Sequence, residues 1–513
     1  MAVQEDKATR RHCWTCRQRR LVCDFTRPAC RRCTADGRAC PGYAAVKPVR
    51  LEWLVPGRIS SRGRRQQQQQ QEEEQSRNGC ETSLLAQPQV PIDSATAHVL
   101  EAAEYYNTCI GPTVEPMMQV APGLGVVEIS PSVFHRFMAA PDYVRQIVVC
   151  SALGHRLCRS RYQNSPATAM LEQRFFRSRG LMIASLHDDI DANQLCDRVI
   201  VGIIALLVID VRQGISHHSW RHHLEGIRRI IKMRGGQQLC ASLGVVPSLL
   251  QFLLGSLAVL GDTTSPASDM AIRPDHLVLY NFLVDRYAAR HDLFTMFPAP
   301  LFTETIRINY LRMRAAHGDP DLDPGLRIEL RDEAEAILGR LYAFSPEKWA
   351  QSRSSFPSPS PPPSTTYEED CQLIGRVYQT AVILYAIPSL QSVSVLPYSP
   401  LLSHDCTALC QRLHTLLQGS LSSPKFQRLL FWPLIVLGVH ASKENPDTPS
   451  PHYQSFVRRH LHEIGRFTGT YNAQAALDVL DRFWPRGGGW DDCFDRPYLL
   501  YSSQGVDGRG LKD

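Results

Sequence analysis

The chain has 513 residues, more than three times a typical domain of roughly 150 residues, so two or more folding units are expected. Hydrophobic residues make up 43% and charged residues 21%, which describes a soluble globular protein. The longest unbroken apolar run, 199–209, has 11 residues and is too short to span a bilayer. The first residues, MAVQEDKATRRHC, lack the apolar stretch of a secretory signal. We therefore expect neither a membrane protein nor a secreted one.

The positive charge of the chain is concentrated at its start. Residues 1–65 hold sixteen Lys and Arg against five acids, a net charge of +11, whereas the whole chain carries +6. The remaining residues therefore have a net charge of −5. This distribution suggests that residues 1–65 bind a polyanion and that the mildly acidic remainder of the chain does not.

Composition divides the chain into five segments. They are a basic arm (1–12), a cysteine-rich module (13–43), a linker (44–95), a large body (96–500) and a tail (501–513). The linker contains six consecutive glutamines followed by three glutamates, with too little apolar material to form a core, so we expect it to be disordered. A Ser/Pro-rich insert at 351–367 interrupts the body and is predicted to be an exposed loop.

The body shows helical periodicity throughout. As one example, Leu224, Ile227 and Ile231 fall on one face of a predicted helix, and Gly235–Gly236 supply its stop signal. No sustained alternation of polar and apolar residues bounded by turn signals is present, which argues against a large sheet. The prediction is a large all-α domain of about 400 residues.

Six of the sixteen cysteines lie in one 28-residue window with a regular spacing. They are Cys13, Cys16, Cys23, Cys30, Cys33 and Cys40. The first three and the last three are copies of one pattern, offset by 17 residues. In a reducing compartment, zinc is the natural partner of clustered thiols.

The number of cysteines limits how zinc can bind. A structural zinc ion takes four ligands in a tetrahedron, and six thiolates cannot complete two separate tetrahedra. Two of the six must therefore bridge, which gives a cluster of two Zn²⁺ ions with a formal charge of −2. So short a segment has no hydrophobic core of its own. Metal binding must therefore supply its folding free energy, about 10–16 kcal/mol for structural zinc sites.

This window resembles the binuclear zinc cluster of fungal Zn2Cys6 transcription factors. Besides the cysteine spacing, the resemblance includes the basic segment 17–20 and Pro28 in the loop that joins the halves. It implies that Cys13 and Cys30 bridge the metals. One zinc would take Cys13, Cys16, Cys23 and Cys30, and the other would take Cys30, Cys33, Cys40 and Cys13.

The same resemblance implies binding to double-stranded DNA at CGG-type sites. The positions that match the base-reading basic pair are Arg19 and Arg20, and arginine can donate two hydrogen bonds to guanine. Arg17, Arg31 and Arg32 are predicted to contact phosphates. Val22 stands where the family commonly has Lys or Arg. We therefore expect one phosphate contact fewer and a weaker salt dependence.

The body resembles the fungal-specific transcription factor domain in four segments. They are 105–112, 220–236, 344–350 and 432–438. The resemblance implies an all-helical regulatory domain that senses a metabolite or binds partner proteins. The linker has no heptad of apolar positions over three repeats, so a coiled-coil dimer is not expected there. A homodimer through the helical body and a monomer on one triplet both remain open.

Two other spacings in the body resemble metal sites but are interpreted as structural. The pair His218 and His222, near a helix start, is expected to be solvated or to cap the helix. Cys406, Cys410 and His414 belong to an apolar helical stripe, which core cysteines explain without metal. No phosphate-binding loop or nucleophile motif supports an enzyme.

Together these features predict a nuclear, sequence-specific regulator of RNA polymerase II transcription. It would bind two Zn²⁺ ions and DNA, act with the transcription machinery and catalyse no reaction. It would control a metabolic pathway or a secondary-metabolite gene cluster. The alternative is a zinc-stabilised regulator that binds proteins and does not bind DNA productively.

Overall fold

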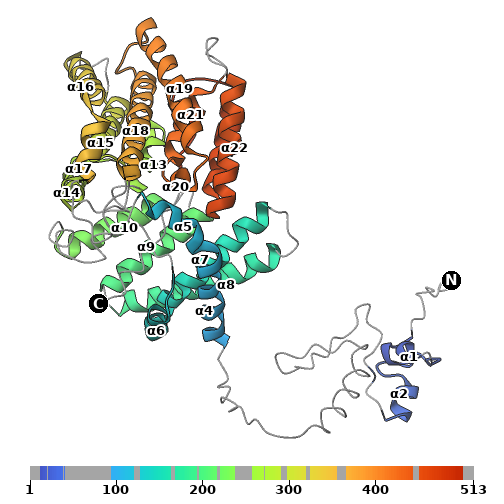
Figure 1. The fold of residues 1–513 in the computed structure, drawn as a ribbon. Coiled ribbons are helices and arrows are strands. Elements are labelled where there is room, and N and C mark those ends of the chain that lie inside the picture. The colour runs from blue at the N-terminus through green and yellow to red at the C-terminus, as the bar shows by residue number, and fades with distance from the viewer. Residues whose placement is uncertain are drawn as a thin grey trace. The chain divides into compact units, whose positions relative to one another are not determined.

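The structure is a computed structural model that describes the cysteine module and most of the body. The described residues are 12–19, 21–37, 40, 94–120, 128–162, 168–192, 196–215, 220–236, 257–270, 272–290, 297–318, 324–354, 365–442 and 450–500. The chain divides into two compact units, with the boundary between residues 90 and 91. The first unit contains the cysteine module and the second a helical domain (Figure 1).

Every regular element in the described residues is a helix or a helical turn. The module has α1 (Trp14–Gln18) and α2 (Arg31–Ala35). The helical domain starts with α4 (Ser94–Tyr105), the π-helical turn η1 (Tyr106–Ile110), α5 (Gly111–Met118), α6 (Pro131–Ala139), α7 (Asp142–Tyr162), α8 (Thr168–Asp191) and α9 (Asp197–Arg212). The predicted all-α body is thus confirmed.

The other helical elements of this domain in the described residues follow along the chain. They are α10 (Trp220–Met233), α13 (Val259–Thr263), the short 3₁₀ turn η3 (Ala267–Asp269), α14 (Pro274–Arg290), α15 (Ala299–His317), α16 (Pro324–Ala343), α17 (Pro346–Ser354), α18 (Thr365–Ser392), α19 (Pro400–Ser420), α20 (Pro424–Gln427), α21 (Phe431–His440), α22 (Ser450–Thr468), α23 (Asn472–Phe483) and the 3₁₀ turn η4 (Asp491–Cys493).

The predicted segment boundaries differ from the helix ends by a few residues. Helix α4 begins at Ser94, two residues before the predicted start of the body. Helices α17 and α18 extend into both ends of the Ser/Pro-rich insert. The rest of that insert, the arm before residue 12, the predicted linker up to residue 93 and the tail lie outside the described residues.

Local sequence signals place several helix ends. The Ser399 hydroxyl accepts a hydrogen bond from the Leu402 amide at 3.2 Å, and Pro400 occupies the first turn, so α19 begins there. At the end of α10, Gly235 and Gly236 have φ angles of 97° and 62°, in the left-handed region that favours glycine. The predicted stop of this helix is confirmed.

Helix α18 is the central helix of the larger hydrophobic core. Every residue from Thr380 to Ile387 is buried, and the helix packs against α15, α16, α17, α19 and α21. By length and composition α18 could cross a membrane, since its best window has a mean hydropathy of 1.3. However, 83% of that window is buried inside the domain. Such burial is typical of a core helix, whose side chains are apolar on all faces.

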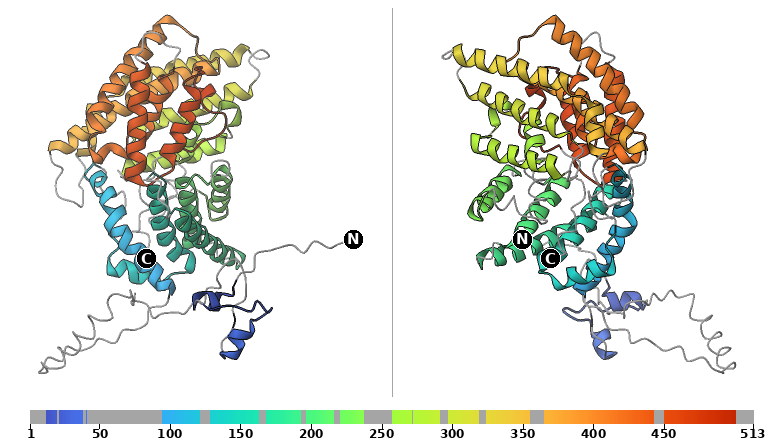
Figure 2. Two further views of the ribbon diagram at one scale, coloured as in Figure 1. Left: turned by 90° about the vertical axis from the view of Figure 1, so that its right-hand side faces the viewer. Right: turned by 60° about the vertical axis from the view of Figure 1, so that its left-hand side comes forward.

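A smaller core joins α4, α6, α7 and α8, and helix α9 contributes to both cores. Ile204 and Leu207 pack into the larger core, whereas Ala205, Leu206 and Ile209 pack into the smaller one. This explains why α9 contains the longest apolar run of the sequence. Figure 2 shows α6–α8 at one end of the domain and α15–α22 at the other.

Arg312 of α15 is fully buried at the centre of a polar network in the larger core. Its guanidinium donates to the Tyr385 hydroxyl at 2.8 Å and to the Ser265 carbonyl at 2.9 Å, and it forms an ion pair with Asp491. A buried guanidinium requires a counter-charge and hydrogen-bond acceptors. The network therefore ties α15 and α18 to the segment before η3 and to η4.

Candidate zinc centre and nucleic-acid interface

Both short helices of the module begin at a cysteine. Cys13 is the N-cap of α1, and its sulfur accepts a hydrogen bond from the Cys16 amide at 3.4 Å. Cys30 is the N-cap of α2, and its sulfur accepts one from the Cys33 amide at the same distance. The 17-residue repeat in the sequence therefore corresponds to a repeat in the structure. In both halves, a sulfur satisfies an amide that the first helical turn leaves without a partner.

The sulfur atoms of the six cysteines converge in two groups of four. One group is Cys13, Cys16, Cys23 and Cys30, and the other is Cys13, Cys30, Cys33 and Cys40. Within each group all sulfurs lie within 4.8 Å of one another, and Cys13 and Cys30 belong to both. Among the side chains that the structure describes, no other set of three or more His, Cys, Asp or Glu converges in this way.

The sulfur separations fit zinc. In a tetrahedron with zinc–sulfur bonds of about 2.3 Å, neighbouring sulfurs are about 3.8 Å apart. The Cys13 and Cys30 sulfurs lie 3.6 Å apart, and the Cys16–Cys30 and Cys13–Cys33 pairs lie 3.7 Å apart. The six cysteines are thus positioned to bind two zinc ions.

Burial makes these thiols dependent on a cation. Desolvation raises the pKa of the Cys13 and Cys16 thiols, and it raises the pKa of Cys30 to about 12. Zinc requires the thiolate form, so zinc binding must displace these protons. The ion then supplies the charge that a buried thiolate needs.

Three residues outside the cysteine array support it, and the sequence analysis did not identify them. The His12 ring accepts a hydrogen bond from the Cys23 amide at 3.1 Å and packs edge-on against Phe25, whose φ is 61°. The Asp24 carboxylate accepts from the Arg31 amide at 3.0 Å, at the start of α2. Its hydrogen bond from Thr26 lowers the pKa of Asp24. The available signals were His12 directly before the first cysteine and Asp24 directly after the third.

The predicted DNA-contacting arginines are only partly described. Arg17, Arg31 and Arg32 are exposed, which a contact with phosphate requires. Arg19 is also exposed, and its Nη1 atom lies 2.5 Å from Asp36 Oδ2. Arg20 lies outside the described residues.

The Arg19–Asp36 ion pair joins the two halves of the module. The residues are 17 positions apart, so each occupies the equivalent position in its own half, just after a short helix. The hydrogen bond to Asp36 raises the pKa of Arg19. Asp36 thereby restricts the orientation of a side chain that was predicted to read bases.

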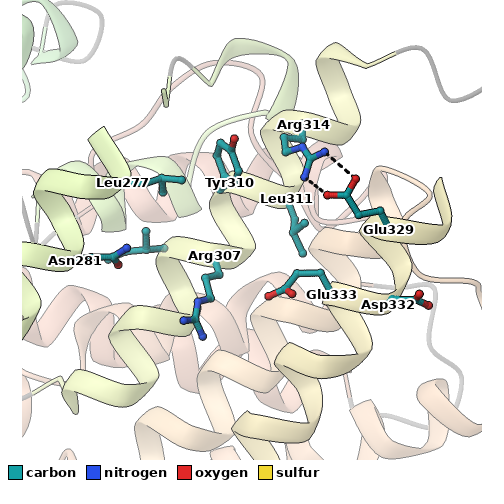
Figure 3. Close-up of a pocket in the computed structure, with 10 residues that line it drawn as sticks. Leu277, Asn281, Arg307, Tyr310, Leu311, Arg314, Glu329, Asp332 and Glu333 are labelled. Carbon is teal, nitrogen blue, oxygen red and sulfur yellow. Dashed lines mark hydrogen bonds and ion pairs between the residues drawn. The ribbon is translucent and has the colours of Figure 1, made fainter. Parts of the chain in front are cut away.

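The helical domain has an open cleft of about 550 Å³ between α14, α15 and α16 (Figure 3). Leu277 and Tyr310 line it together with two arginines. Arg314 donates to both carboxylate oxygens of Glu329, at 2.9 and 3.4 Å, and Arg307 pairs with Glu304 at 2.6 Å. Both cations are thus engaged by carboxylates, and we assign no anion-binding site to the cleft.

The described residues include all of one metal-like spacing of the body and half of the other. His222 is exposed, as the sequence predicts, and His218 lies outside the described residues. Cys410 is buried in the larger core, and Cys406 packs against it. The His414 ring lies 4.7 Å from the Phe456 ring, measured between centroids. Cys406, Cys410 and His414 are thus packing residues.

Comparison with known proteins identifies the class of this protein. Residues 11–47 match the fungal Zn(2)-Cys(6) binuclear cluster domain, and residues 138–499 match the fungal specific transcription factor domain. The second match covers more than half of the chain. The chain therefore belongs to the fungal zinc-cluster transcription factors, a family of DNA-binding regulators that are not enzymes. Membership of this family implies action in the nucleus.

Two relatives are regulators of biosynthetic gene clusters. The phomenoic acid biosynthesis cluster-specific transcriptional regulator of Leptosphaeria maculans is 34% identical over 515 residues, which cover 99% of this chain and 92% of the relative. The aspercryptin biosynthesis cluster-specific transcription regulator of Emericella nidulans is 40% identical over 55 residues, 11% of this chain and 9% of that protein. No solved structure matches the chain significantly.

Proposed function

We propose that this chain reads CGG-type sites in double-stranded DNA through its zinc module and regulates transcription by RNA polymerase II in the nucleus. The observation that carries the proposal is the pair of four-sulfur groups that share Cys13 and Cys30, with exposed arginines beside them. A rigid, metal-held scaffold can present arginine side chains at fixed positions. The +11 net charge of residues 1–65 supplies the electrostatic attraction to the DNA.

Within the cluster, Cys13 and Cys30 take the bridging positions because each belongs to both sulfur groups. The first zinc is held by Cys13, Cys16, Cys23 and Cys30, and the second by Cys13, Cys30, Cys33 and Cys40. Each bridging thiolate also caps a helix, so the metal site and the start of each helix are coupled. Loss of either bridging sulfur would remove a ligand from both ions.

Arg19 and Arg20 read guanine bases, and Arg17, Arg31 and Arg32 contact phosphates. The contact with Asp36 is compatible with base reading, because a guanidinium has five N–H donors and the hydrogen bond to Asp36 uses Nη1. Asp36 would hold one edge of Arg19 while the other edge faces the guanine O6 and N7 atoms. Exposed ion pairs contribute little free energy, so this contact can also yield to DNA.

The target genes are proposed to form a secondary-metabolite biosynthesis cluster. The support is the relative from Leptosphaeria maculans, whose name specifies the phomenoic acid biosynthesis cluster and which matches almost the whole chain. The helical domain would regulate activity and recruit the transcription machinery.

The test is selection of binding sites from a random DNA pool with the full, zinc-loaded chain. We expect CGG triplets to be enriched. The variant Arg20→Ala should keep two bound zinc ions and lose about tenfold or more of its selectivity for CGG. The matched variant Arg38→Ala removes an arginine from the same module, outside the predicted contact set, and should retain that selectivity.

Two results would contradict this function. If Arg20→Ala selects CGG as well as the parent chain does, the assignment of the base reader is wrong. If the chain binds two zinc ions but enriches no sequence, the cluster is structural. In that case, the zinc-stabilised interaction protein becomes the correct interpretation. Chelation of zinc should abolish every sequence-specific enrichment, because the module has no other source of folding free energy.

A further inference from the structure

One ring nitrogen of His12 has a partner in the zinc module, and the other has none among the described residues. The Nδ1 atom accepts a hydrogen bond from the Cys23 amide at 3.1 Å. Within the described residues no hydrogen bond involves Nε2, and His12 is exposed. A neutral imidazole has one acceptor nitrogen and one donor nitrogen. Because Nδ1 is the acceptor, the proton lies on Nε2, and His12 presents an N–H donor to the solvent.

Two contacts fix the orientation of the His12 ring. Besides the hydrogen bond from Cys23, the ring packs edge-on against Phe25, with 5.2 Å between the ring centroids and 60° between the ring planes. Cys23 is 1% exposed, and its sulfur belongs to one of the four-sulfur groups. The Nε2–H donor is therefore held against the metal-binding part of the module. It has little rotamer freedom left to lose when it binds an acceptor.

The His12 ring lies beside the segment that is predicted to contact DNA. The amide that donates to it belongs to the peptide bond between Val22 and Cys23, at the end of that segment. Val22 is 73% exposed and has no charge with which to bind a phosphate. His12 also directly precedes the N-cap of α1, a helix of five residues that is therefore about 7.5 Å long. Arg17, on α1, is thus close to His12 as well.

The acidic residue next to Cys23 is engaged by the second half of the module. Oδ2 of Asp24 accepts a hydrogen bond from the Arg31 amide at 3.0 Å and another from the Thr26 hydroxyl at 2.7 Å. A carboxylate beside the His12 ring would repel a phosphate or accept the Nε2–H itself. Because Asp24 is held at the start of α2, its charge is directed at these donors and not at the His12 ring.

We propose that His12 donates its Nε2–H to a DNA phosphate beside the CGG triplet, next to the position where Val22 supplies no phosphate contact. Phosphate and sugar oxygens accept at least half of all hydrogen bonds between proteins and DNA, so they are the natural acceptors for an outward-facing N–H. An uncharged imidazole releases no counterion, so the contact adds affinity without adding salt dependence. The contact rests on the proposed function, since it forms only when the module is bound to DNA.

His12→Asn separates the contact with DNA from the contact with Cys23. The asparagine Oδ1 atom can still accept from the Cys23 amide, but no atom takes the place of Nε2. In the full, zinc-loaded chain, this variant should keep its bound zinc. Its dissociation constants for CGG sites and for random DNA should both rise about threefold to tenfold, with unchanged selectivity and an unchanged slope of affinity against salt. His98→Asn, at an exposed histidine of α4, is the matched control and should bind as the parent chain does.

The contacted phosphate can be identified by replacing single phosphates of the CGG site with uncharged methylphosphonates. At the phosphate that His12 contacts, the replacement should weaken binding by the parent chain more than binding by His12→Asn, which has no contact there to lose. At every other phosphate the two chains should respond equally. Val22→Lys should strengthen binding more in His12→Asn than in the parent chain, because the lysine and His12 would compete for one phosphate.

An unchanged dissociation constant in His12→Asn, or equal responses of the two chains at every phosphate, would overturn the contact. A loss of bound zinc or of CGG selectivity in His12→Asn would also overturn it, because His12 would then act on the fold of the module. These outcomes are separate from failure of the proposed function. A parent chain that selects no DNA sequence would refute that function, whereas a His12→Asn chain that binds CGG sites as tightly as the parent would refute the phosphate contact alone.

Discussion

At the scale of single residues, the least expected feature is that Arg19 is paired before any DNA is present. Its Nη1 atom lies 2.5 Å from Asp36, and the two residues are equivalent positions of the 17-residue repeat. A long, flexible side chain loses rotamer freedom when it binds a base, and an acidic neighbour removes part of that freedom beforehand. In the proposed function, Asp36 is therefore a positioning residue for Arg19.

Replacing Asp36 distinguishes the effect of its negative charge on DNA affinity from its effect on the orientation of Arg19. Asp36→Asn removes a negative charge near the DNA and releases Arg19. Binding to random DNA should become tighter, because the repulsion between Asp36 and phosphate is lost. The preference for CGG over random DNA should fall about tenfold. Competition binding at two salt concentrations measures both changes, and Asp6→Asn in the N-terminal arm serves as the charge-matched control. Unchanged selectivity would show that Asp36 does not orient Arg19.

At the scale of elements, the attachment of α8 to α9 depends on a charge buried between two helices. Asp210 is almost inaccessible, and both of its oxygens accept from Arg179 at 2.6 Å. The contact with Asp210 raises the pKa of Arg179. A bidentate pair of this kind fixes the rotation of α8 as well as its position.

Removing one partner of this pair should be costly. Arg179→Ala leaves the buried Asp210 carboxylate without its counter-charge, which typically destabilises a domain by about 3–5 kcal/mol. Glu335→Ala breaks an exposed pair, in which Arg331 Nε lies 2.9 Å from Glu335, and should cost less than about 1 kcal/mol. Urea unfolding followed by circular dichroism compares the two. If both variants lose the same free energy of unfolding, the Arg179–Asp210 pair contributes no more stability than an exposed ion pair.

At the scale of the whole molecule, buried histidines make the stability of the helical domain depend on pH. Burial lowers the pKa of His155 and His440, and it lowers the pKa of His276 to about 4, with the charge of Arg228 adding to the effect. As the pH falls below about 6.5, these histidines bind protons in the unfolded chain but stay neutral in the folded domain. The domain should therefore lose stability between about pH 6.5 and about pH 4.

The contribution of His276 can be isolated by substitution. In the parent chain, His276 Nδ1 accepts a hydrogen bond from the Arg273 amide at 3.4 Å. His276→Gln keeps a side-chain acceptor for that amide but cannot bind a proton. Between about pH 6.5 and about pH 4, the slope of unfolding free energy against pH should become shallower by at most about 1.4 kcal/mol per pH unit. The exposed His404→Gln is the control and should follow the parent chain. An unaltered slope in His276→Gln would show that His276 is not held neutral in the folded domain.

Much of the fold could be predicted because its signals are local. The stripe Leu224, Ile227 and Ile231 is buried on one face of α10, and the two glycines after it end the helix as expected. Such patterns depend on helix periodicity and backbone sterics, which act over a few residues. The boundaries near residues 96 and 351 were less accurate, because tertiary packing extends helices beyond their sequence signals.

The sequence by itself determined that six cysteines bind two zinc ions with two of them bridging, since six thiolates cannot complete two separate tetrahedra. The resemblance implied that Cys13 and Cys30 bridge, and the fold brings their sulfurs into both groups of four. The sequence also determined that the body is helical. Only the tertiary structure brought together residues that no local pattern connects, such as Arg312 and Asp491, or Arg179 and Asp210. Packing likewise decided which apolar residues of α8 face the core and which face outward. A sequence contains the periodicity of a helix, but its orientation is set by the neighbours against which it packs.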